Sequence, residues 1–318
     1  MKNVLVLLPV QERHKEILRA AGEGCELTFV PADEVTEAQV QAAEVILGNP
    51  PAELLKASEQ LKLLQVSTAG TDPYIAPGVL GPHTLLTNST GAYSQAVAEH
   101  AFALTLMLQK KLHLYHLDQT RALWSEHGTV SSLCGSTVVI VGLGDIGRYY
   151  ANLVKAMGAY VIGVKRRGGE KPDCVDELCL TAELDRVLPR ADVVMSVLPN
   201  TAGTVHFYTD ACFDLMKESA IFINCGRGSA VASDVLYRAL TEHKIAAAGV
   251  DVTEPEPLPA DSPLWGLEDL VITPHISGWN HLPETFERVV RIAAENLSAY
   301  CKGEPLRNLV DRSTGYKI

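Results

Sequence analysis

The sequence has little that would suit a disulfide-stabilised, membrane-spanning or nucleic-acid-binding protein. Its seven cysteines (25, 134, 174, 179, 212, 225 and 301) include no Cys-x-x-Cys pair, so we expect reduced thiols in a cytoplasmic protein and no disulfide framework. No apolar run approaches the roughly 20 residues that are needed to span a bilayer. Lys and Arg total 27 against 38 Asp and Glu, a formal net charge of −11, which argues against general affinity for nucleic acids or anionic membranes.

Signals for a leader peptide or a metal site are also weak. The apolar run of residues 1–10 passes directly into a charged segment without a small-residue cleavage site, so we expect a first buried strand there. His113 and His116 form a single His-x-x-His on a helix-like segment with no third ligand nearby, so we expect no metal. The 318 residues are enough to bury a large core and suggest about two domains.

Strand-like and helix-like segments alternate through both halves of the chain, a pattern typical of parallel sheets covered by helices on both faces. Strands are predicted at residues 4–8, 25–30, 44–48, 61–66, 84–87, 137–141, 160–164, 193–198, 220–224, 247–252 and 270–273. Helices are predicted near residues 15–21, 36–43, 52–58, 96–108, 116–123, 148–157 and 283–300. We therefore predict an α/β fold with two doubly wound parallel-sheet domains.

A glycine-rich turn follows the β-branched run of residues 137–141 and precedes a helix-like segment. Its sequence, Gly142-Leu143-Gly144-Asp145-Ile146-Gly147, has the spacing and the context of a dinucleotide-binding fingerprint. Gly142 would permit the tight turn, Gly144 would let the backbone approach a pyrophosphate, and Gly147 would let the helix pack on the strand. The alternative is an ordinary glycine-rich turn between a strand and a helix.

The next predicted strand ends in Lys165-Arg166-Arg167. A site for NAD would place a carboxylate near here to bind the ribose 2′-hydroxyl, but no acid stands within two residues of Lys165. Three cations would instead attract the 2′-phosphate of NADP. We therefore predict NADP in preference to NAD, although NAD remains possible; the alternative is a solvated basic turn.

Three further polar groups follow predicted strands in the second half of the chain. Arg227 stands between two glycines, and such an arginine can bind a carboxylate through two hydrogen bonds. Glu254 and Glu256 each precede a proline, and His275 has a side chain suited to general acid–base chemistry. Taken singly, these residues could be a surface arginine, a solvated acidic loop and a structural histidine. A loop around Ala69-Gly70 follows a strand in the first half and could expose backbone N–H groups to a ligand; an equally good interpretation of this stretch alone is a plain turn.

Taken together, the motifs resemble those of the D-isomer-specific 2-hydroxyacid dehydrogenase family. The resemblance rests on Ala69 to Asp72, Ala96 to His100, Gly142 to Gly147, Leu198-Pro199, Asn224 to Gly228, Asp251 to Pro257 and Pro274-His275. It implies a discontinuous substrate domain, residues 1–98 and 283–318, around a dinucleotide-binding domain, residues 99–282. It also implies a cleft between the domains and a homodimer built mainly through the cofactor domain.

The same resemblance implies roles for the catalytic residues. Arg227 would orient the carboxylate and the 2-keto oxygen of the substrate, and His275 would donate a proton to that oxygen. Glu256 would pair with His275 and help to keep it protonated; Glu254 is the rival for this role. Backbone N–H groups of Ala69 and Gly70 would hold the substrate carboxylate.

The resemblance also extends the cofactor site beyond the glycine turn and the basic cluster. Asp251 would bind the nicotinamide carboxamide, and the other expected contacts come from Asp145, Ile146, Leu198, Pro199, Thr204, Cys225, Gly226 and Gly278. Oxidation of Cys225 could inhibit the protein, or Cys225 could be an inert small residue. Trp279 could shape the substrate pocket or simply pack.

The expected activity is hydride transfer between NADP(H) and a 2-keto acid or D-2-hydroxy acid. The basic cluster resembles those of glyoxylate and hydroxypyruvate reductases, and this resemblance implies glyoxylate or hydroxypyruvate as the substrate, while larger keto acids remain open. One alternative is a corepressor-type protein that binds the dinucleotide with little turnover. Formate dehydrogenase is a second rival, but members of that group use a Gln where this chain has Glu256.

Overall fold

The computed structural model describes residues 1–56, 58–279, 281–313 and 316–317. It divides into two compact units, Met1–Tyr93 with Asn280–Ile318, and Ser94–Trp279. The first boundary lies at the start of helix α4 (Ser94–Gln109), so the whole of this helix belongs to the second unit. The predicted boundary after residue 98 lay inside the helix, and the predicted boundary after residue 282 lies a few residues beyond the observed one. The assignment of substrate and cofactor to the two units stays a prediction.

The first unit is built on a five-stranded parallel sheet in the order β2-β1-β3-β4-β5. Its strands are β1 (Lys2–Val6), β2 (Cys25–Phe29), β3 (Val45–Leu47), β4 (Leu63–Gln65) and β5 (Leu85–Thr87). Alternate residues of one strand enter two different cores, since Val4 packs on one face of the sheet and Leu5 on the other. Burial on both faces explains why these strands read as nearly continuous apolar runs.

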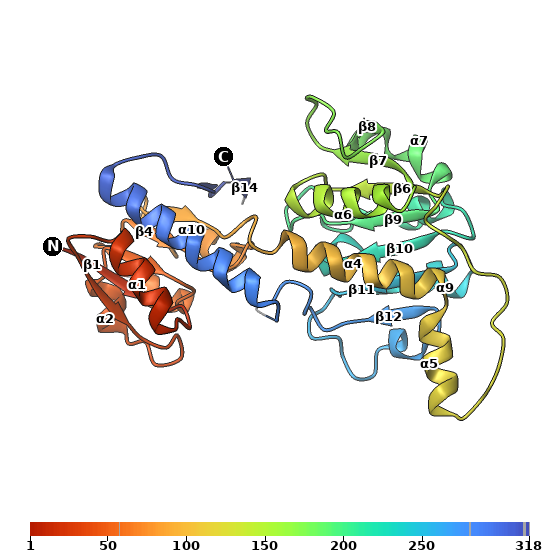
Figure 1. Cartoon of the computed structure of the whole chain (residues 1–318), viewed down its shortest axis with the longest axis horizontal. Coiled ribbons are helices and arrows are strands. Elements are labelled where there is room, and N and C mark those ends of the chain that lie inside the picture. Colours follow the sequence, from red (N-terminus) through yellow and green to blue (C-terminus); the bar gives the residue numbers. More distant parts are fainter. Residues whose placement is uncertain (57, 280, 314–315, 318) are drawn as a thin grey trace. The chain divides into compact units, whose positions relative to one another are not determined.

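Helices cover both faces of this sheet. Helices α1 (Glu12–Ala21) and α10 (Pro283–Lys302) lie side by side over one face (Figure 1). The other face is covered by α2 (Glu37–Ala42), the 3₁₀ turn η1 (Ala52–Leu55) and α3 (Asp72–Ile75). The predicted helix at 52–58 is therefore a short 3₁₀ turn, and residue 57 of that prediction lies outside the described residues. The unit ends in the antiparallel strands β13 (Val310–Asp311) and β14 (Tyr316–Lys317).

The second unit is built on a seven-stranded sheet in the order β12-β11-β10-β9-β6-β7-β8, in which every pairing is parallel. Its strands are β6 (Thr137–Val141), β7 (Tyr160–Lys165), β8 (Glu177–Leu180), β9 (Val193–Ser196), β10 (Ile221–Asn224), β11 (Ala247–Val250) and β12 (Leu270–Ile272). The order turns outward in both directions from β6 and β9, which is the arrangement of a dinucleotide-binding Rossmann sheet. All strand carboxyl ends lie along one edge, because the strands are parallel.

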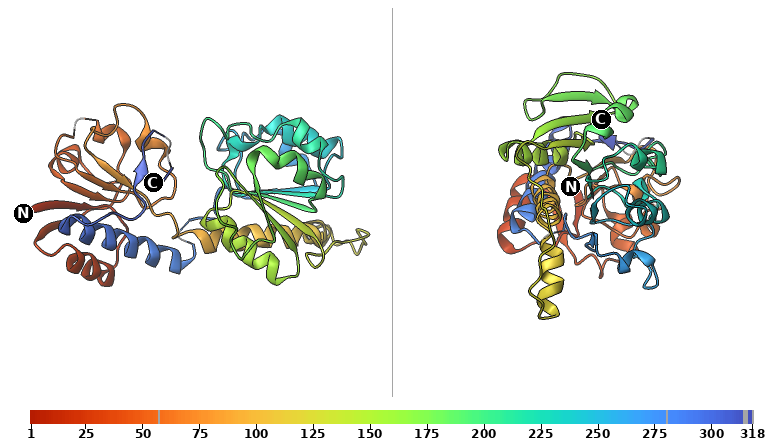
Figure 2. Two further views of the ribbon diagram at one scale, coloured as in Figure 1. Left: turned by 90° about the horizontal axis from the view of Figure 1, so that it is seen from above. Right: turned by 90° about the vertical axis from the view of Figure 1, so that its right-hand side faces the viewer.

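Two layers of helices enclose the second sheet. Helices α4 and α6 (Asp145–Ala156) pack together on one face, as Figure 2 shows. The other face is covered by α7 (Leu184–Val187), α8 (Asp210–Asp214) and α9 (Ser233–Thr241). Short 3₁₀ turns are η2 (Thr181–Glu183), η3 (Leu188–Arg190), η4 (Gly228–Ala230) and η5 (Pro263–Gly266). Helix α5 spans Leu112–Thr120, so the predicted end at residue 123 is wrong: Ala122 has a φ of 53° and cannot continue the helix.

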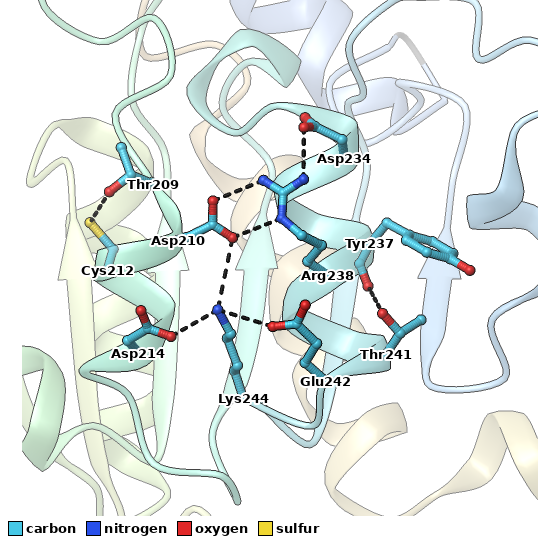
Figure 3. A network of polar contacts seen from close by, with 10 residues as sticks. All are labelled: Thr209, Asp210, Cys212, Asp214, Asp234, Tyr237, Arg238, Thr241, Glu242 and Lys244. Carbon is cyan, nitrogen blue, oxygen red and sulfur yellow. Dashed lines mark hydrogen bonds and ion pairs between the residues drawn. The ribbon is translucent and has the colours of Figure 1, made fainter.

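Helices α8 and α9 are joined by a network of ion pairs on the surface of the second unit (Figure 3). Arg238 donates to both oxygens of Asp210, at 3.0 and 2.8 Å, and to Asp234 at 2.9 Å. Lys244 lies 2.8 Å from Asp214 and 3.3 Å from Glu242. Each cation of the network therefore faces at least two carboxylates.

Candidate active site and cofactor site

The three glycines after β6 occupy positions that constrain them in three different ways. Gly142 has a φ of 106°, and a Cβ there would lie 2.8 Å from the carbonyl oxygen of Val197. A Cβ on Gly147 would lie 2.2 Å from the carbonyl oxygen of Gly142, so only glycine lets α6 begin so close to the turn. Apart from Gly144 itself and its chain neighbours, no described residue has an atom within 4 Å of the Cβ position of Gly144. The backbone at Gly144 therefore faces open space at the amino end of α6, where a diphosphate can approach.

The residues predicted between the glycines, Asp145 and Ile146, form the first turn of α6. Gly144 is the residue immediately before the helix, and its carbonyl oxygen accepts from the N–H of Arg148 at 2.9 Å. The positive end of the helix dipole is thus directed at the open side of the turn. This arrangement fits the binding of a dinucleotide pyrophosphate.

The basic cluster, Lys165, Arg166 and Arg167, lies at the carboxyl end of β7, the strand that pairs directly with β6. Neighbouring strands lie about 4.8 Å apart, so the cluster adjoins the glycine turn. A Cβ on Gly169 would come within 3.2 Å of Lys165 Nζ, which places this ammonium group close to the backbone of the turn. The site can therefore offer several cations to an anionic group on the adenosine ribose.

The other predicted cofactor contacts lie in turns at the carboxyl ends of β9, β10 and β12. Leu198 and Pro199 follow β9, and Thr204 closes their turn by donating to the carbonyl oxygen of Pro199 at 2.6 Å. Gly278 lies in the turn after β12. Trp279, by contrast, has a side chain that is 62% exposed, so within the second unit it does not act as a buried packing residue.

Cys225 and Gly226 follow β10 and are both buried. Burial raises the pKa of the Cys225 thiol above its usual range, and this holds the sulfur in its less reactive protonated form. A Cβ on Gly226 would lie 2.6 Å from the carbonyl oxygen of Leu198. The predicted cofactor contacts of Cys225 and Gly226 stay a prediction, and the burial of the thiol argues against the oxidation of Cys225.

Arg227 follows β10, the third of the seven strands along the sheet, at the edge formed by the strand carboxyl ends. Its Nη1 donates to the carbonyl oxygen of Gly226 at 3.0 Å, and its own carbonyl oxygen accepts from Asn224 Nδ2 at 3.0 Å. A Cβ on Gly228 would lie 1.8 Å from the carbonyl oxygen of Thr253. The loop that carries Arg227 therefore contacts the loop after β11 without an intervening side chain.

His275 and Glu256 form a direct pair, with 2.8 Å between His275 Nδ1 and Glu256 Oε2. The second oxygen of Glu256 accepts from the N–H of Thr253 at 3.0 Å, so the carboxylate is held from two sides. His275 Nε2 has no hydrogen-bond partner among the described residues. Because a carboxylate can only accept, the Nδ1 atom carries a proton when the pair is formed, and Nε2 is left for a substrate.

Glu254, the rival acid, pairs with a different histidine. His206 Nε2 lies 2.6 Å from Glu254 Oε2, and the N–H of His206 donates to the carbonyl oxygen of Ser229 at 2.7 Å. Ser233 Oγ also donates to the carbonyl oxygen of Glu254 at 2.6 Å. No signal in the sequence identifies His206, because its partner lies 48 residues away and no periodic pattern links the two.

Asp251 is almost fully buried, with an exposure of 1%. Its carboxylate accepts from Thr273 Oγ1 at 2.6 Å and from the N–H groups of Ile276 and Ser277 at 3.0 Å each. Its carbonyl oxygen accepts from the N–H of His275 at 2.8 Å. Asp251 thus holds the turn that carries His275, a function that its predicted contact with the nicotinamide had not suggested.

The predicted carboxylate-binding groups, Ala69 and Gly70, follow β4 in the first unit. Asn88 Nδ2 donates to the carbonyl oxygen of Ala69 at 2.8 Å, and Thr68 Oγ1 donates to that of Gly70 at 2.7 Å. The N–H groups of both residues lack acceptors in the described part of the chain. Two adjacent donors therefore remain at the carboxyl end of this sheet, while the joint site with Arg227 and His275 stays a prediction.

Among the described residues no three or more His, Cys, Asp or Glu side chains form a group that could hold a metal ion. Both ring nitrogens of His113 are buried and have no hydrogen-bond partner in the part of the chain that the structure describes, and burial lowers the pKa of its imidazole. None of the described helices combines the length and the apolar character that crossing a bilayer requires.

The parallel sheet, the glycine turn and the helix that begins at the turn define a dinucleotide-binding α/β protein. Residues 102–277 match the family model for the NAD-binding domain of D-isomer specific 2-hydroxyacid dehydrogenases. A glyoxylate reductase from Korarchaeum cryptofilum is 31% identical over 269 residues, which cover 82% of this chain and 79% of that protein. The chain belongs to the D-isomer specific 2-hydroxyacid dehydrogenase family.

Solved structures agree over nearly the whole length of the chain. A family member from Aeromonas salmonicida subsp. salmonicida shares 33% identity and a TM-score of 0.86, covering 98% of this chain and 99% of its own. A probable 2-hydroxyacid dehydrogenase from Rhizobium etli, solved with NADP, HEPES and L(+)-tartaric acid, shares 27% identity and a TM-score of 0.80, covering 99% and 100%. The two-sheet α/β architecture predicted from the sequence is thereby confirmed, and the family is one of oxidoreductases that act on small hydroxy or keto acids.

Proposed function

We propose that this protein reduces a small 2-keto acid of the glyoxylate or hydroxypyruvate type to the D-2-hydroxy acid, with NADPH as the preferred reductant. The observation that carries the proposal is the pairing of His275 with Glu256 beside the loop of Arg227, at the carboxyl edge of the second sheet. The glyoxylate reductase similarity supports the substrate class.

In this proposal His275 is the general acid. Glu256 accepts from Nδ1 and stabilises the imidazolium form, and the second nitrogen donates its proton to the keto oxygen as that oxygen gains negative charge. Arg227 supplies a guanidinium that can bind the substrate carboxylate and stabilise the developing alkoxide. The N–H groups of Ala69 and Gly70 would hold the same carboxylate from the first unit.

The reduced nicotinamide, when bound, supplies the hydride. The open backbone at Gly144 and the amino end of α6 would hold the pyrophosphate, and the carboxylate of Asp251 would accept from the carboxamide. The cluster of Lys165, Arg166 and Arg167 would bind the 2′-phosphate, which is why we propose NADPH over NADH. The complex of the Rhizobium etli relative with NADP is consistent with this preference.

A homodimer formed through the second unit is the assembly we propose. Leu112 and Leu123 are each 52% exposed, and the side chain of Trp124 is fully exposed. These exposed apolar side chains at the two ends of α5 would be covered by a second copy of the chain. Sedimentation at several concentrations tests the assembly, and a monomer throughout would contradict it.

A dinucleotide-sensing protein with little turnover is the alternative function, because some members of the family are corepressors. The test is an initial-rate screen of glyoxylate, hydroxypyruvate and larger 2-keto acids with NADPH and NADH. We expect turnover with at least one small 2-keto acid and a higher kcat/KM with NADPH. Tight dinucleotide binding with no turnover on any keto acid would favour the alternative, and a clear preference for NADH would contradict the cofactor assignment.

A further inference from the structure

His100 contributes to none of the roles assigned above, yet its side chain reaches the centre of the site within the second unit. It lies in α4, and its Nε2 is 2.9 Å from Thr273 Oγ1. Thr273 in turn donates to Asp251 Oδ1 at 2.6 Å. A hydroxyl has a single proton, and here that proton is directed to the carboxylate. Thr273 must therefore accept from His100, which requires a proton on His100 Nε2.

The carboxylate at the end of this chain of hydrogen bonds has little capacity left. Asp251 Oδ1 already accepts from Thr273 and from the N–H of Ile276, and Oδ2 accepts from the N–H of Ser277. A carboxylate oxygen accepts about two hydrogen bonds, so only Oδ2 can take one more. The rotation of the carboxylate decides where that remaining acceptor points.

We propose that His100 is a positioning residue for the nicotinamide end of the cofactor. Through Thr273 it fixes the rotation of the Asp251 carboxylate, and this reserves Oδ2 for the carboxamide N–H. The same carboxylate accepts from the backbone of the turn that carries His275. His100 therefore helps to position both the acceptor for the carboxamide, Asp251 Oδ2, and the proposed general acid, His275. The inference rests on the proposed dinucleotide function and adds a residue to it.

A role in packing alone would leave a different signature. The side chain of His100 is 23% exposed, so its loss also removes packing contacts and can lower the free energy of unfolding. A packing loss alone should weaken all ligands of the second unit alike, whereas a loss of the hydrogen bond should weaken only a ligand that carries the nicotinamide. Two ligands separate these effects: NADPH, and 2′-phospho-ADP-ribose, which has the phosphates but no nicotinamide.

The first measurement is the Kd of each ligand for the full chain by titration calorimetry. Loss of one hydrogen bond that orders a buried carboxylate is worth roughly 3- to 10-fold in affinity. We expect His100→Ala to raise the Kd for NADPH by about this factor. The Kd for 2′-phospho-ADP-ribose should stay within about 2-fold of the wild-type value. Equal changes for both ligands, or no change for either, would overturn the proposal.

Two further substitutions form a matched pair. The amide nitrogen of a Gln can occupy the place of His Nε2. The side chain of an Asn is too short for its amide nitrogen to reach Thr273. We expect His100→Gln to restore NADPH affinity to within about 2-fold of wild type, and His100→Asn to behave like the Ala variant. If Gln and Asn give equal affinities while both variants keep the wild-type Tm, the donor role is excluded.

Failure of the proposed function would be visible earlier. If the wild-type chain binds neither NADPH nor 2′-phospho-ADP-ribose, nor NADH and ADP-ribose, the dinucleotide function is wrong and the inference falls with it. If the wild type prefers NADH, the same variants are compared with NADH and ADP-ribose, and the expected ratios are unchanged. A wild type that binds and a variant series that shows no nicotinamide-specific loss would overturn the inference alone.

Discussion

Two charged regions of the second unit are built in opposite ways. In the α8–α9 network each cation faces several carboxylates: Arg238 contacts Asp210 and Asp234, and it lowers the pKa of both carboxyl groups. At the carboxyl edge of the sheet Glu254 and Glu256 each face one histidine, and His275 keeps a ring nitrogen without a partner among the described residues. The network is satisfied internally, whereas the edge keeps donors for a ligand. Substitutions should therefore affect stability in the first region and turnover in the second.

The largest effect is expected at the catalytic edge. His275→Ala or Arg227→Ala should lower kcat/KM for the best keto acid by about 1,000-fold or more, since each removes a group that stabilises the developing negative charge. The measurement is steady-state turnover, with Tm and NADPH affinity as controls for folding. A variant with near-normal kcat/KM would remove that residue from the mechanism.

A smaller effect should separate the two acids of the Glu-Pro-Glu-Pro segment. Glu256→Gln should lower kcat/KM by about 30- to 100-fold because the imidazolium loses its charged partner. The matched control, Glu254→Gln, should stay within about 3-fold of wild type, because its histidine, His206, is not the proposed acid. Equal losses in the two variants would mean that both pairs serve the reaction.

The basic cluster should show a selective effect. Arg166→Ser should weaken the binding of NADPH by at least about 10-fold, because one charge-assisted hydrogen bond is lost. The affinity for NADH should stay nearly unchanged. Titration of both cofactors gives the ratio directly. Parallel losses for NADPH and NADH would show that Arg166 does not recognise the 2′-phosphate.

The smallest effect on activity is expected in the α8–α9 network. Arg238→Gln should lower Tm by about 1–3 °C at pH 7 and leave kcat/KM unchanged. Asp210 and Asp234 have lowered pKa values in the folded chain, so their contribution is present above the unfolded carboxyl pKa of about 3.9 and is lost as the pH falls through the folded values.

Thermal unfolding measured from pH 7 down to pH 3 tests whether this contribution to stability is lost as the pH falls. The Tm difference between wild type and Arg238→Gln should shrink below about pH 4, where the carboxyl groups become protonated. A difference that is independent of pH would mean that Arg238 stabilises the helices through packing. A loss of turnover would mean that the two regions are not separable.

The parts of the fold that follow local signals could be predicted from the sequence. The strand before Gly142 and the turn itself are continuous in sequence, and their spacing reflects backbone geometry. Residues 116–123 were predicted as helix, but the start at Leu112 and the end at Thr120 depend on left-handed backbone at Lys111 and Ala122. Neither residue is a glycine, so composition carries no such signal.

The site residues could be predicted where they lie in a family motif. They could not be predicted where the contact joins residues that are far apart in the sequence. Arg227 and His275 lie in motifs, but the choice between Glu254 and Glu256 rested on the resemblance alone, and the pairs with His206 and His275 come from the folded geometry. The contact between His100 and Thr273 joins residues 173 positions apart. Such pairs depend on which strands become neighbours, and no short-range pattern encodes that.

The glycines on either side of Arg227 restrict how this protein can be varied. Gly226 lies against Leu198 and Gly228 against Thr253, with room for no Cβ at either place. Any larger residue would push apart three adjacent loops and move the guanidinium and both acids together. A saturation library at these two positions should therefore return only glycine among active clones, and new substrate preferences will have to be sought on other segments.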